Sequence, residues 1–451
     1  MNLSGCFKAY DVRGRVPGEL NPDSVYSIGR AYAAWLGPQR VAVGRDIRQS
    51  SVELSLALIR GLTDSGVDVL DIGLCGTEGV YFATFSQELD GGIMVTASHN
   101  PVDYNGLKFV REKSIPVSGD TGLLEIRALA ESGQFPESAR RGSVRDLDIW
   151  PSYRRHLRGL VEWQELRALK IVSNAGNGGA GLAVELIAQD LPFTIVRLHH
   201  EADGSFPNGV PNPMLEENRA VTSRAVLENG ADLGIAFDGD YDRCFFFDEQ
   251  GRFIDGYYIV GLLASVFLAR HPGSRILHDP RVTWNTIDIV REAGGVPVLC
   301  KSGHAFMKQK MREADAVYGG EMSAHHYFRD FGYCDSGMVP WLVVAQHLSQ
   351  SGKPLSALVD ERMKMFPSSG EINRTLSDQK AAIEAVRRRY IPGALSVDDI
   401  DGLSVEYQRW RFNLRSSNTE PLLRLNVESR GDRGLMQEKT MEILRFLEPW
   451  A

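Results

Sequence analysis

The sequence lacks an excess of positive charge and any long uncharged run. Its 451 residues carry 50 Lys and Arg against 58 Asp and Glu, which gives a net charge of −8. That sign disfavours binding to a nucleic-acid backbone or to an anionic membrane surface. The apolar run at residues 257–269 is shorter than the ~20 residues that span a bilayer. We therefore expect neither nucleic acid nor a membrane as a partner.

Cysteines are few and scattered. The five of them contain no C-x-x-C pair, which argues against a disulfide framework or a structural zinc site and predicts buried, reduced thiols. A secretory signal is not expected, because Lys8, Asp11 and Arg13 interrupt any apolar stretch at the N-terminus. These features predict a cytoplasmic protein.

A strand, an amphipathic helix and a second strand follow one another three times along the chain. The three sets are 41–46, 52–64 and 67–72; 169–173, 181–189 and 193–198; and 275–278, 284–293 and 296–300. Each set is a β-α-β unit, which needs parallel strands joined by a crossover. The pattern predicts an α/β protein with three related α/β domains and mixed sheets.

Polar or turn-forming segments separate these domains, and the last part of the chain has a different pattern. The breaks are residues 136–148, 248–252 and 366–371. After them come a predicted helix at 380–389, strands around 404–414 and 422–429, and a final helix at 435–447. We expect a smaller C-terminal α+β domain there. The predicted domains are 1–146, 147–250, 251–365 and 366–451.

An acidic turn lies between two apolar runs at residues 238–243, with the sequence Asp-Gly-Asp-Tyr-Asp-Arg. Asp238, Asp240 and Asp242 occupy alternate positions, so their oxygens can converge on one hard cation such as Mg²⁺. An EF-hand loop does not fit, because its sixth position is Gly and here it is Arg243. The alternative is a solvated acidic turn, although the apolar flanks place it at the edge of a buried sheet.

A second loop, Thr-Ala-Ser-His-Asn-Pro at residues 96–101, follows an apolar strand. A hydroxyl at the carboxyl end of a strand is where α/β folds place nucleophiles and ligand contacts, which makes Ser98 a candidate nucleophile. Lys108 follows ten residues later and could reach the same loop. An ordinary turn is the alternative, because Ser and Asn before Pro are common turn formers.

Two further loops carry groups suited to a phosphorylated sugar. Glu321, Ser323 and His325 alternate along an extended loop and could grip several hydroxyls; the His325–His326 pair could also suggest a metal site, but it lacks a third His or Cys at ligand spacing. Residues 415–421 combine a guanidinium, hydroxyls and turn N–H groups in an arrangement suited to phosphate. A capped turn without ligand is the alternative for that segment.

These four loops occur together and in this order, and the chain resembles the α-D-phosphohexomutase superfamily over essentially its whole length. The resemblance is closest to the bacterial phosphomannomutase/phosphoglucomutase branch, which serves GDP-mannose and surface-polysaccharide synthesis, and it extends to residues 7–14 and 303–304. It implies four domains around a central cleft, each supplying one loop. The implied reaction interconverts mannose 6-phosphate and mannose 1-phosphate through a phosphoserine and a hexose 1,6-bisphosphate, which also acts as activator.

The resemblance also implies roles for individual residues. Ser98 is expected to carry the phosphoryl group and, with Asp238, Asp240 and Asp242, to bind one Mg²⁺ per subunit. The other expected catalytic residues are Arg13, His99, Lys108 and Arg243, of which His99 and Lys108 are both candidates for proton transfer. The expected substrate-binding residues are Tyr10, Arg281, His304, Glu321, Ser323, His325, Arg415, Ser417, Asn418 and Thr419.

Other functions compete with this one. A phosphohydrolase with an aspartate nucleophile also uses Asp-x-Asp, but it would leave Ser98 idle; a non-catalytic sugar-phosphate sensor needs no metal loop beside a nucleophile. Within the family, phosphoglucomutase or dual activity is the first alternative and phosphoglucosamine mutase the next. Two positions depart from the family pattern: Ala324 stands where many relatives carry Gly, and Arg281 stands where some carry Lys. Both leave the preference among sugars open. We expect a monomer or a weak homo-oligomer.

Overall fold

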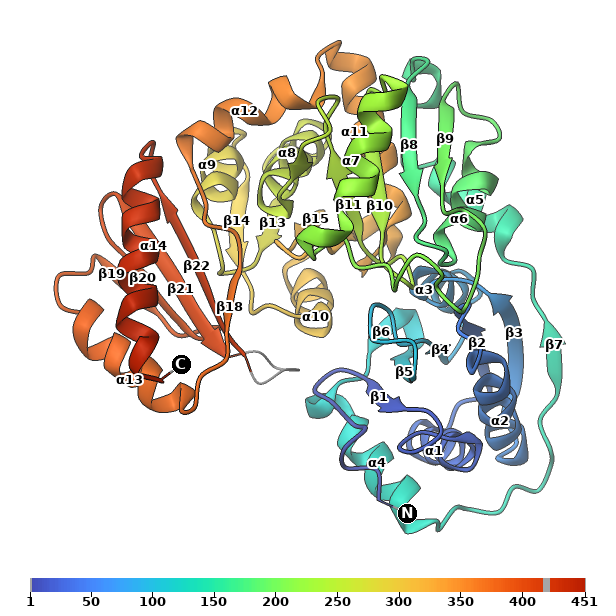
Figure 1. Cartoon of the computed structure of the whole chain (residues 1–451). Helices are drawn as coiled ribbons and strands as arrows, with labels where there is room; N and C mark the ends of the chain where they lie inside the picture. Colours follow the sequence, from blue (N-terminus) through green and yellow to red (C-terminus); the bar gives the residue numbers. More distant parts are fainter. Residues whose placement is uncertain (1, 417–421, 451) are drawn as a thin grey trace. The chain divides into compact units, whose positions relative to one another are not determined.

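The structure is a computed structural model that describes residues 2–416 and 422–450 (Figure 1). Contacts within the chain divide it into two compact units. The first comprises Met1–Phe253 and His325–Gly352, and the second comprises Ile254–Ala324 and Lys353–Ala451. Each unit is described by itself below. The fold is α/β with mixed sheets up to the C-terminal part, whose sheet is antiparallel, as the sequence predicts.

The first unit begins with a mixed sheet in the order β1-β5-β4-β2-β3-β7, with β6 paired to β5. Strands β2, β3, β4 and β7 run parallel, whereas β1, β4 and β6 pair with β5 antiparallel. The strands are β1 (Val12–Arg15), β2 (Arg40–Arg45), β3 (Asp68–Leu74), β4 (Gly91–Val95), β5 (Tyr104–Arg111), β6 (Ile115–Pro116) and β7 (Val144–Asp146). The helices are α1 (Pro22–Leu36), α2 (Ser51–Asp64), α3 (Thr77–Ser86) and α4 (Leu123–Ser132).

The two faces of this sheet are covered by different helices. Alternate strand residues such as Val43 and Ile93 join one apolar cluster with α1, α2 and α4. The residues between them point the other way: a Cβ on Gly44 or Gly92 would lie within 2.8 Å of Val80 on α3. The period of two along a strand therefore sorts large residues to one face and glycines to the face where α3 packs closely.

A second mixed sheet follows in the same unit. Here β10 runs parallel to β8, β8 runs parallel to β9, and β10 pairs with β11 antiparallel. The elements are α5 (Trp150–Arg158), β8 (Lys170–Asn174), α6 (Ala180–Ala188), β9 (Thr194–Leu198), α7 (Ala220–Asn229), β10 (Leu233–Phe237) and β11 (Cys244–Phe247). After β12 (Phe253–Ile254) the chain passes to the second unit, and it returns for β16 (His326–Phe328), β17 (Cys334–Asp335) and α11 (Met338–Ser351).

The second unit opens with a parallel arrangement in which β13 pairs with both β14 and β15. Its elements are α8 (Gly256–Arg270), β13 (Arg275–His278), α9 (Trp284–Glu292), β14 (Val296–Leu299), α10 (His304–Ala314) and β15 (Tyr318–Gly320), followed later by α12 (Leu355–Met365). Added Cβ atoms on Gly319 and Gly320 would meet Met311 of α10 and Val260 of α8 respectively. The two helices therefore cover opposite faces of β15.

The C-terminal part is an antiparallel sheet in the order β18-β22-β21-β20-β19. Its elements are β18 (Ile372–Arg374), α13 (Gln379–Tyr390), β19 (Ser396–Asp398), β20 (Leu403–Glu406), β21 (Trp410–Ser416), β22 (Leu423–Ser429) and α14 (Arg433–Leu447). Phe412 and Leu414 pack against α13 and α14, which lie beside these strands in Figure 1. The alternate residues Arg411, Asn413 and Arg415 therefore occupy the opposite, polar face.

All three predicted β-α-β units are confirmed as parallel strand pairs joined through a helix, and the C-terminal α+β fold is confirmed as well. One local difference is β7, which lies inside the polar stretch 136–148 that the sequence predicts as irregular. It pairs with the edge strand β3 although its side chains are exposed, so it carries no hydrophobic signal. The five cysteines are free and buried. No helix in the described part of the chain is long and apolar enough to cross a membrane.

Candidate active site

The three aspartates of the acidic turn meet at one point of the first unit. The turn joins the antiparallel strands β10 and β11, whose last paired residues are Phe237 and Cys244. Asp238, Asp240 and Asp242 are each no more than 2% exposed, and each offers an oxygen within 4.8 Å of the others. Three buried carboxylates at this spacing repel one another strongly and require positive charge between or beside them.

Lys108 and Arg243 supply part of that positive charge. Lys108 Nζ donates to Asp240 Oδ2 at 2.7 Å and to Asp242 Oδ2 at 2.6 Å, and Arg243 donates to Asp238 Oδ2 through Nε at 2.9 Å and Nη2 at 2.7 Å. Burial raises the pKa of Asp238 to about 6, even though Arg243 opposes that effect. Burial and Asp242 would raise the pKa of Asp240 too, but Lys108 and Arg13 lower it below its usual value. The charge balance of the turn is therefore incomplete at Asp238.

The donor set fits a hard divalent cation. Asp240 Oδ1 and Asp242 Oδ1 are buried and accept no hydrogen bond from any residue in the described ranges. Buried carboxylate oxygens without donors are costly, and a cation ligated by them removes that cost. Asp238, Asp240 and Asp242 are therefore the residues that would hold a metal.

The Ser98 loop lies against this acidic turn. Ser98 follows β4 and has a left-handed backbone with φ of +48°, which is unusual for a residue with a side chain. Its Oγ donates to Asp238 Oδ2 at 2.7 Å and lies 3.1 Å from His99 Nδ1. The predicted nucleophile and the predicted metal ligands therefore adjoin, although 140 residues separate them in sequence.

Gly239 makes this close approach possible. A Cβ at residue 239 would lie 2.3 Å from the Ser98 carbonyl oxygen and 3.0 Å from its carbonyl carbon. Gly76 and Gly337 likewise leave no room for a Cβ against Tyr241, whose φ is +44°. Glycines thus allow several close backbone approaches to the acidic turn.

A buried arginine that the motifs do not reveal holds the Ser98 loop in place. Arg48 is 2% exposed and donates to four carbonyl oxygens along the loop. Its acceptors and distances are Ser98 at 2.8 Å, Asn100 at 2.6 Å, Pro101 at 2.8 Å and Tyr104 at 3.0 Å. Asp46 pairs with Arg48 and also accepts from Thr96 Oγ1 at 2.7 Å. One guanidinium therefore replaces the backbone partners that this tight loop lacks.

Three more predicted residues lie around the same point of the first unit. Arg243 Nη2 hydrogen-bonds His99 Nδ1, and burial together with Arg243 lowers the pKa of His99 well below its usual value, so His99 is neutral. Arg13 Nη1 donates to the Thr96 carbonyl at 3.1 Å. His325 pairs with Arg243 in an isolated β-bridge, and its Nε2 lies 3.6 Å from Asp242 Oδ1. Tyr10 is half-buried, two residues before β1.

The second unit gathers another set of predicted residues around Arg281. Its guanidinium donates to Asp279 through Nε at 3.0 Å, to Ser323 Oγ at 3.2 Å, and lies 3.6 Å from Glu321 Oε1. Glu321 accepts from the Gly303 backbone N–H at 2.8 Å, next to His304, the first residue of α10. Arg281, His304, Glu321 and Ser323 therefore form one polar cluster at the ends of β13 and β15.

Arg415 extends this cluster onto the C-terminal sheet through a residue that the motifs missed. Glu371 Oε2 lies 3.1 Å from Arg415 Nη2 and 3.5 Å from Arg281 Nη1. The sequence marked Glu371 only as the end of a turn-forming segment. The predicted residues Ser417, Asn418 and Thr419 lie outside the described residues.

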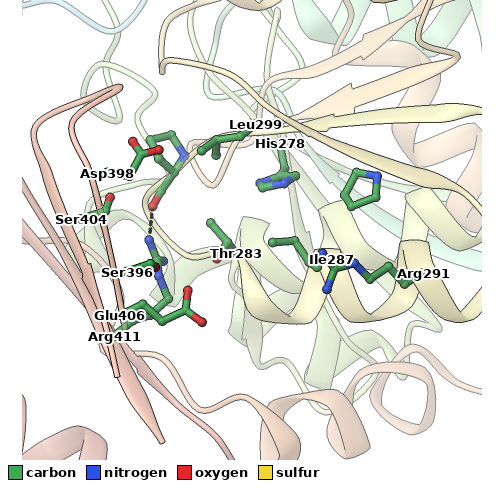
Figure 2. A pocket seen from close by; sticks show the side chains of 12 residues that line it. His278, Thr283, Ile287, Arg291, Leu299, Ser396, Asp398, Ser404, Glu406 and Arg411 are labelled. Atoms are coloured by element: carbon green, nitrogen blue, oxygen red, sulfur yellow. Dashed lines mark hydrogen bonds between the residues drawn. The ribbon is translucent and has the colours of Figure 1, made fainter. Parts of the chain in front are cut away.

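The backbone of the Arg281 loop is fixed by a buried ion pair. Arg411 donates to the carbonyls of Pro280 at 2.9 Å and Arg281 at 3.1 Å, and to Glu428 at 2.8 Å. The same loop borders a cavity of about 250 Å³ between α9 and the strands β19 to β21, whose lining includes His278, Ser404 and Arg411 (Figure 2). On this side, then, polar contacts position the loop that carries Arg281.

Comparisons with known proteins agree with this geometry. Four models of phosphoglucomutase/phosphomannomutase domains match consecutive parts of the chain: alpha/beta/alpha domain I at residues 4–137, domain II at 151–251, domain III at 255–366 and the C-terminal domain at 371–445. A phosphomannomutase of Escherichia coli is 57% identical, covering 98% of this chain and 99% of that protein.

Two further similarities extend this result. A protein of Xanthomonas campestris pv. campestris named "Phosphohexose mutases" is 57% identical over 98% of both chains. The crystal structure of a phosphoglucomutase/phosphomannomutase family protein from Burkholderia thailandensis matches with a TM-score of 0.90 at 34% identity, covering 100% of this chain and 99% of that one. Sequence and fold therefore match the same group of proteins over the whole chain.

Proposed function

Because the chain belongs to the α-D-phosphohexomutase superfamily, we propose that it is an isomerase that interconverts mannose 6-phosphate and mannose 1-phosphate. Several relatives at 55–57% identity over nearly the whole chain are named phosphomannomutase, which supports this main activity. The observation within this chain that supports it most is the contact between the Ser98 hydroxyl and Asp238, which unites a nucleophile with a metal site. The product would supply GDP-mannose for polysaccharide synthesis.

A second activity, on glucose phosphates, is favoured by one observation. Relatives as similar as the phosphomannomutases are named "Phosphohexose mutases", a wider description. Mannose and glucose differ in the orientation of one hydroxyl, and a site that accepts a sugar phosphate in two orientations discriminates weakly between them. We therefore include dual phosphomannomutase/phosphoglucomutase activity in the proposal.

Ser98 is the proposed carrier of the phosphoryl group. In the first half-reaction the bond between phosphorus and Ser98 Oγ breaks while a bond forms to the free hydroxyl of the hexose phosphate, whose proton leaves. The resulting 1,6-bisphosphate turns around, and its other phosphoryl group returns to Ser98. Arg243 and Arg13 flank the Ser98 loop and would stabilise charge on the moving group, which is the main catalytic need in phosphoryl transfer.

The family is metal-dependent, and Asp238, Asp240 and Asp242 would hold the ion together with an oxygen of the phosphoserine. We propose one Mg²⁺ per subunit, because all of these donors are oxygens. Such an ion, when bound, neutralises charge on the phosphoryl group. Removing divalent metal with a chelator should abolish activity, and Mg²⁺ should restore it.

The charge states of two residues suggest how protons move. Burial would lower the pKa of Lys108, but Asp240 and Asp242 raise it above its usual value, so its ammonium keeps its proton and supplies positive charge beside the acidic turn. His99 is neutral, and its Nδ1 accepts from Arg243 Nη2 and lies 3.1 Å from Ser98 Oγ. We propose His99 and Lys108 as the two candidates for proton transfer near the transferred group.

The residues of the second unit would bind the rest of the substrate. Glu321 and Ser323 offer acceptors to sugar hydroxyls, and Arg281 and Arg415 would bind the phosphate that is not reacting, with His304 beside them. We propose that Tyr10, His325, Ser417, Asn418 and Thr419 also bind substrate, and that the chain has four domains with boundaries near 146, 250 and 365. The protein would act in the cytoplasm as a monomer or weak homo-oligomer.

Comparing kcat/KM for mannose 1-phosphate, glucose 1-phosphate and glucosamine 1-phosphate tests the proposed activity. The proposal predicts turnover of the first two within about tenfold of each other, because one epimeric hydroxyl changes binding only modestly, and little turnover of the third. Exclusive turnover of glucosamine 1-phosphate would overturn it.

A further inference from the structure

Three guanidinium groups converge on the single carboxylate of Glu371 in the second unit. Arg281 and Arg415 approach its Oε2 at 3.5 and 3.1 Å, and Arg424 Nη1 approaches its Oε1 at 3.3 Å. The Glu371 side chain is 10% exposed, and those of Arg281 and Arg415 are 2% and 6% exposed. Solvent therefore screens these charges little, and the three guanidiniums share the one carboxylate of Glu371, although Arg281 is also paired with Asp279.

The sheet register explains why a carboxylate is needed at this place. Arg415 on β21 and Arg424 on β22 are direct cross-strand partners, and both lie on the polar face of the sheet. Like charges directly opposite each other destabilise a sheet. Glu371 immediately precedes β18, which pairs with β22 next to Arg424, so the fold delivers an anion to the two arginines.

The carboxylate is charged, and its geometry resembles that of a bound anion. Burial alone would raise the pKa of Glu371, but Arg281, Arg424 and Arg415 together lower it below its usual value. A carboxylate and a phosphate present oxygens to guanidinium groups in the same way, and the phosphate carries more charge. A phosphate that binds Arg281 and Arg415 therefore competes with Glu371 for the same donors.

We propose that Glu371 is a positioning residue that holds Arg281, Arg415 and Arg424 ready for phosphate as an internal counter-anion. When the non-reacting phosphate binds, the guanidiniums pass from Glu371 to it, and they return when it leaves. The contact lowers the net affinity for phosphate but keeps the arginines paired after release. The inference rests on the proposed function in one respect, that Arg281 and Arg415 bind the substrate phosphate.

The effect on turnover follows from this exchange. Without the carboxylate, a phosphate that leaves would take away the anion these guanidiniums share, so release and reorientation become slower while binding becomes tighter. Glu371→Gln should therefore lower KM and kcat together and leave kcat/KM nearly unchanged. A residue that only stabilises the fold would raise KM or lower kcat/KM instead.

Calorimetric titration of the full chain with inorganic phosphate tests the inference directly. E371Q should bind phosphate about tenfold more tightly than the unaltered protein, since close charge pairs at one site couple by at least that factor. E371D, which keeps the charge, should restore most of the unaltered affinity. E384Q is the matched control: it removes the same charge from the exposed Glu384 of α13 and should change nothing.

Weaker or equal phosphate binding by E371Q, in a protein that melts cooperatively, would overturn the inference. If E371Q is unstable, the same measurements are made on E371D. Unchanged kinetics and phosphate affinity in E371D support the role of Glu371 as a counter-anion, whereas a large loss of phosphate affinity contradicts it. Phosphate titration needs no turnover, so it remains informative if mannose 1-phosphate proves not to be a substrate. Failure of the proposed function and failure of this inference are thereby distinguishable.

Discussion

A single methyl group added at Gly239 should push the Ser98 loop and the acidic turn apart. In Gly239→Ala the new Cβ would lie 2.3 Å from the carbonyl oxygen of Ser98, about 1 Å short of ordinary van der Waals contact. The neighbour is backbone, not the end of a flexible side chain, so the Ser98 loop or the acidic turn must shift. Arg48 holds the Ser98 loop from its other side through four carbonyls, which restricts how that shift is absorbed.

The expected cost is mainly catalytic. A displacement of about 1 Å between reacting groups costs on the order of 100-fold in rate, so kcat/KM for mannose 1-phosphate should fall by about that factor. Overpacking at one buried contact costs roughly 1–3 kcal/mol, so the protein should still fold. The affinity for Mg²⁺, measured by titrating the metal into the chelator-treated enzyme, should fall as well, because the phosphoserine oxygen would be displaced.

Gly18→Ala provides the matched control. Gly18 is exposed, and an added Cβ would meet nothing within 4 Å, so this variant should keep full activity. Activity of Gly239→Ala within threefold of the unaltered enzyme, at equal Mg²⁺ affinity, would show that the approach of the acidic turn to Ser98 does not set the rate. The stated geometry would then be irrelevant to catalysis.

Three further variants at two positions test buried polar groups of the first unit. Arg48→Lys keeps a positive charge beside Asp46 but cannot reach all four carbonyl oxygens, so kcat should fall with little change in Tm. Arg48→Met leaves Asp46 without its cation, so the protein should lose about 3–5 kcal/mol of stability. If the two variants showed the same kcat and the same Tm, Arg48 would not be a positioning residue. Burial raises the pKa of Glu78 from 4.5 to about 7, so its native state binds an extra proton between those values and loses up to about 3 kcal/mol as pH rises from 4.5 through 7. Glu78→Gln removes that loss, so its Tm relative to the unaltered protein should increase from pH 5 to pH 8, and a difference independent of pH would refute the shift.

Local patterns predicted much of the fold because each pattern has one structural solution. Residues 41–46 and 67–72 flank an amphipathic helix, an order that requires parallel strands, and the structure pairs them as β2 and β3. The alternate spacing of Asp238, Asp240 and Asp242 predicted convergence, because a turn between antiparallel strands directs such residues to one side. Strand β7 was missed because its side chains are exposed and only its backbone pairs.

The supporting residues of the site could not be predicted for a physical reason. Arg48 acts on carbonyl oxygens about fifty residues away, and carbonyls leave no trace in the side-chain sequence. Glu371 becomes informative only when the sheet register places Arg415 opposite Arg424. The sequence offered one signal for Arg48: it lies two residues after Asp46, at the end of a predicted strand. An Asp and an Arg at that spacing are common, so this signal alone does not predict its role. Sequence motifs identify the residues that contact a ligand. The residues that position those residues can be identified only from tertiary contacts.

Intact-mass measurement shows whether Ser98 carries the transferred phosphoryl group. After incubation with a hexose 1,6-bisphosphate and Mg²⁺, the unaltered protein should gain the mass of one phosphoryl group, located on Ser98 by peptide fragmentation, and return it when mannose 6-phosphate is added. Ser98→Ala should gain none and should not interconvert the two mannose phosphates. Full turnover by Ser98→Ala, or a phosphoryl group located on another residue, would contradict the account.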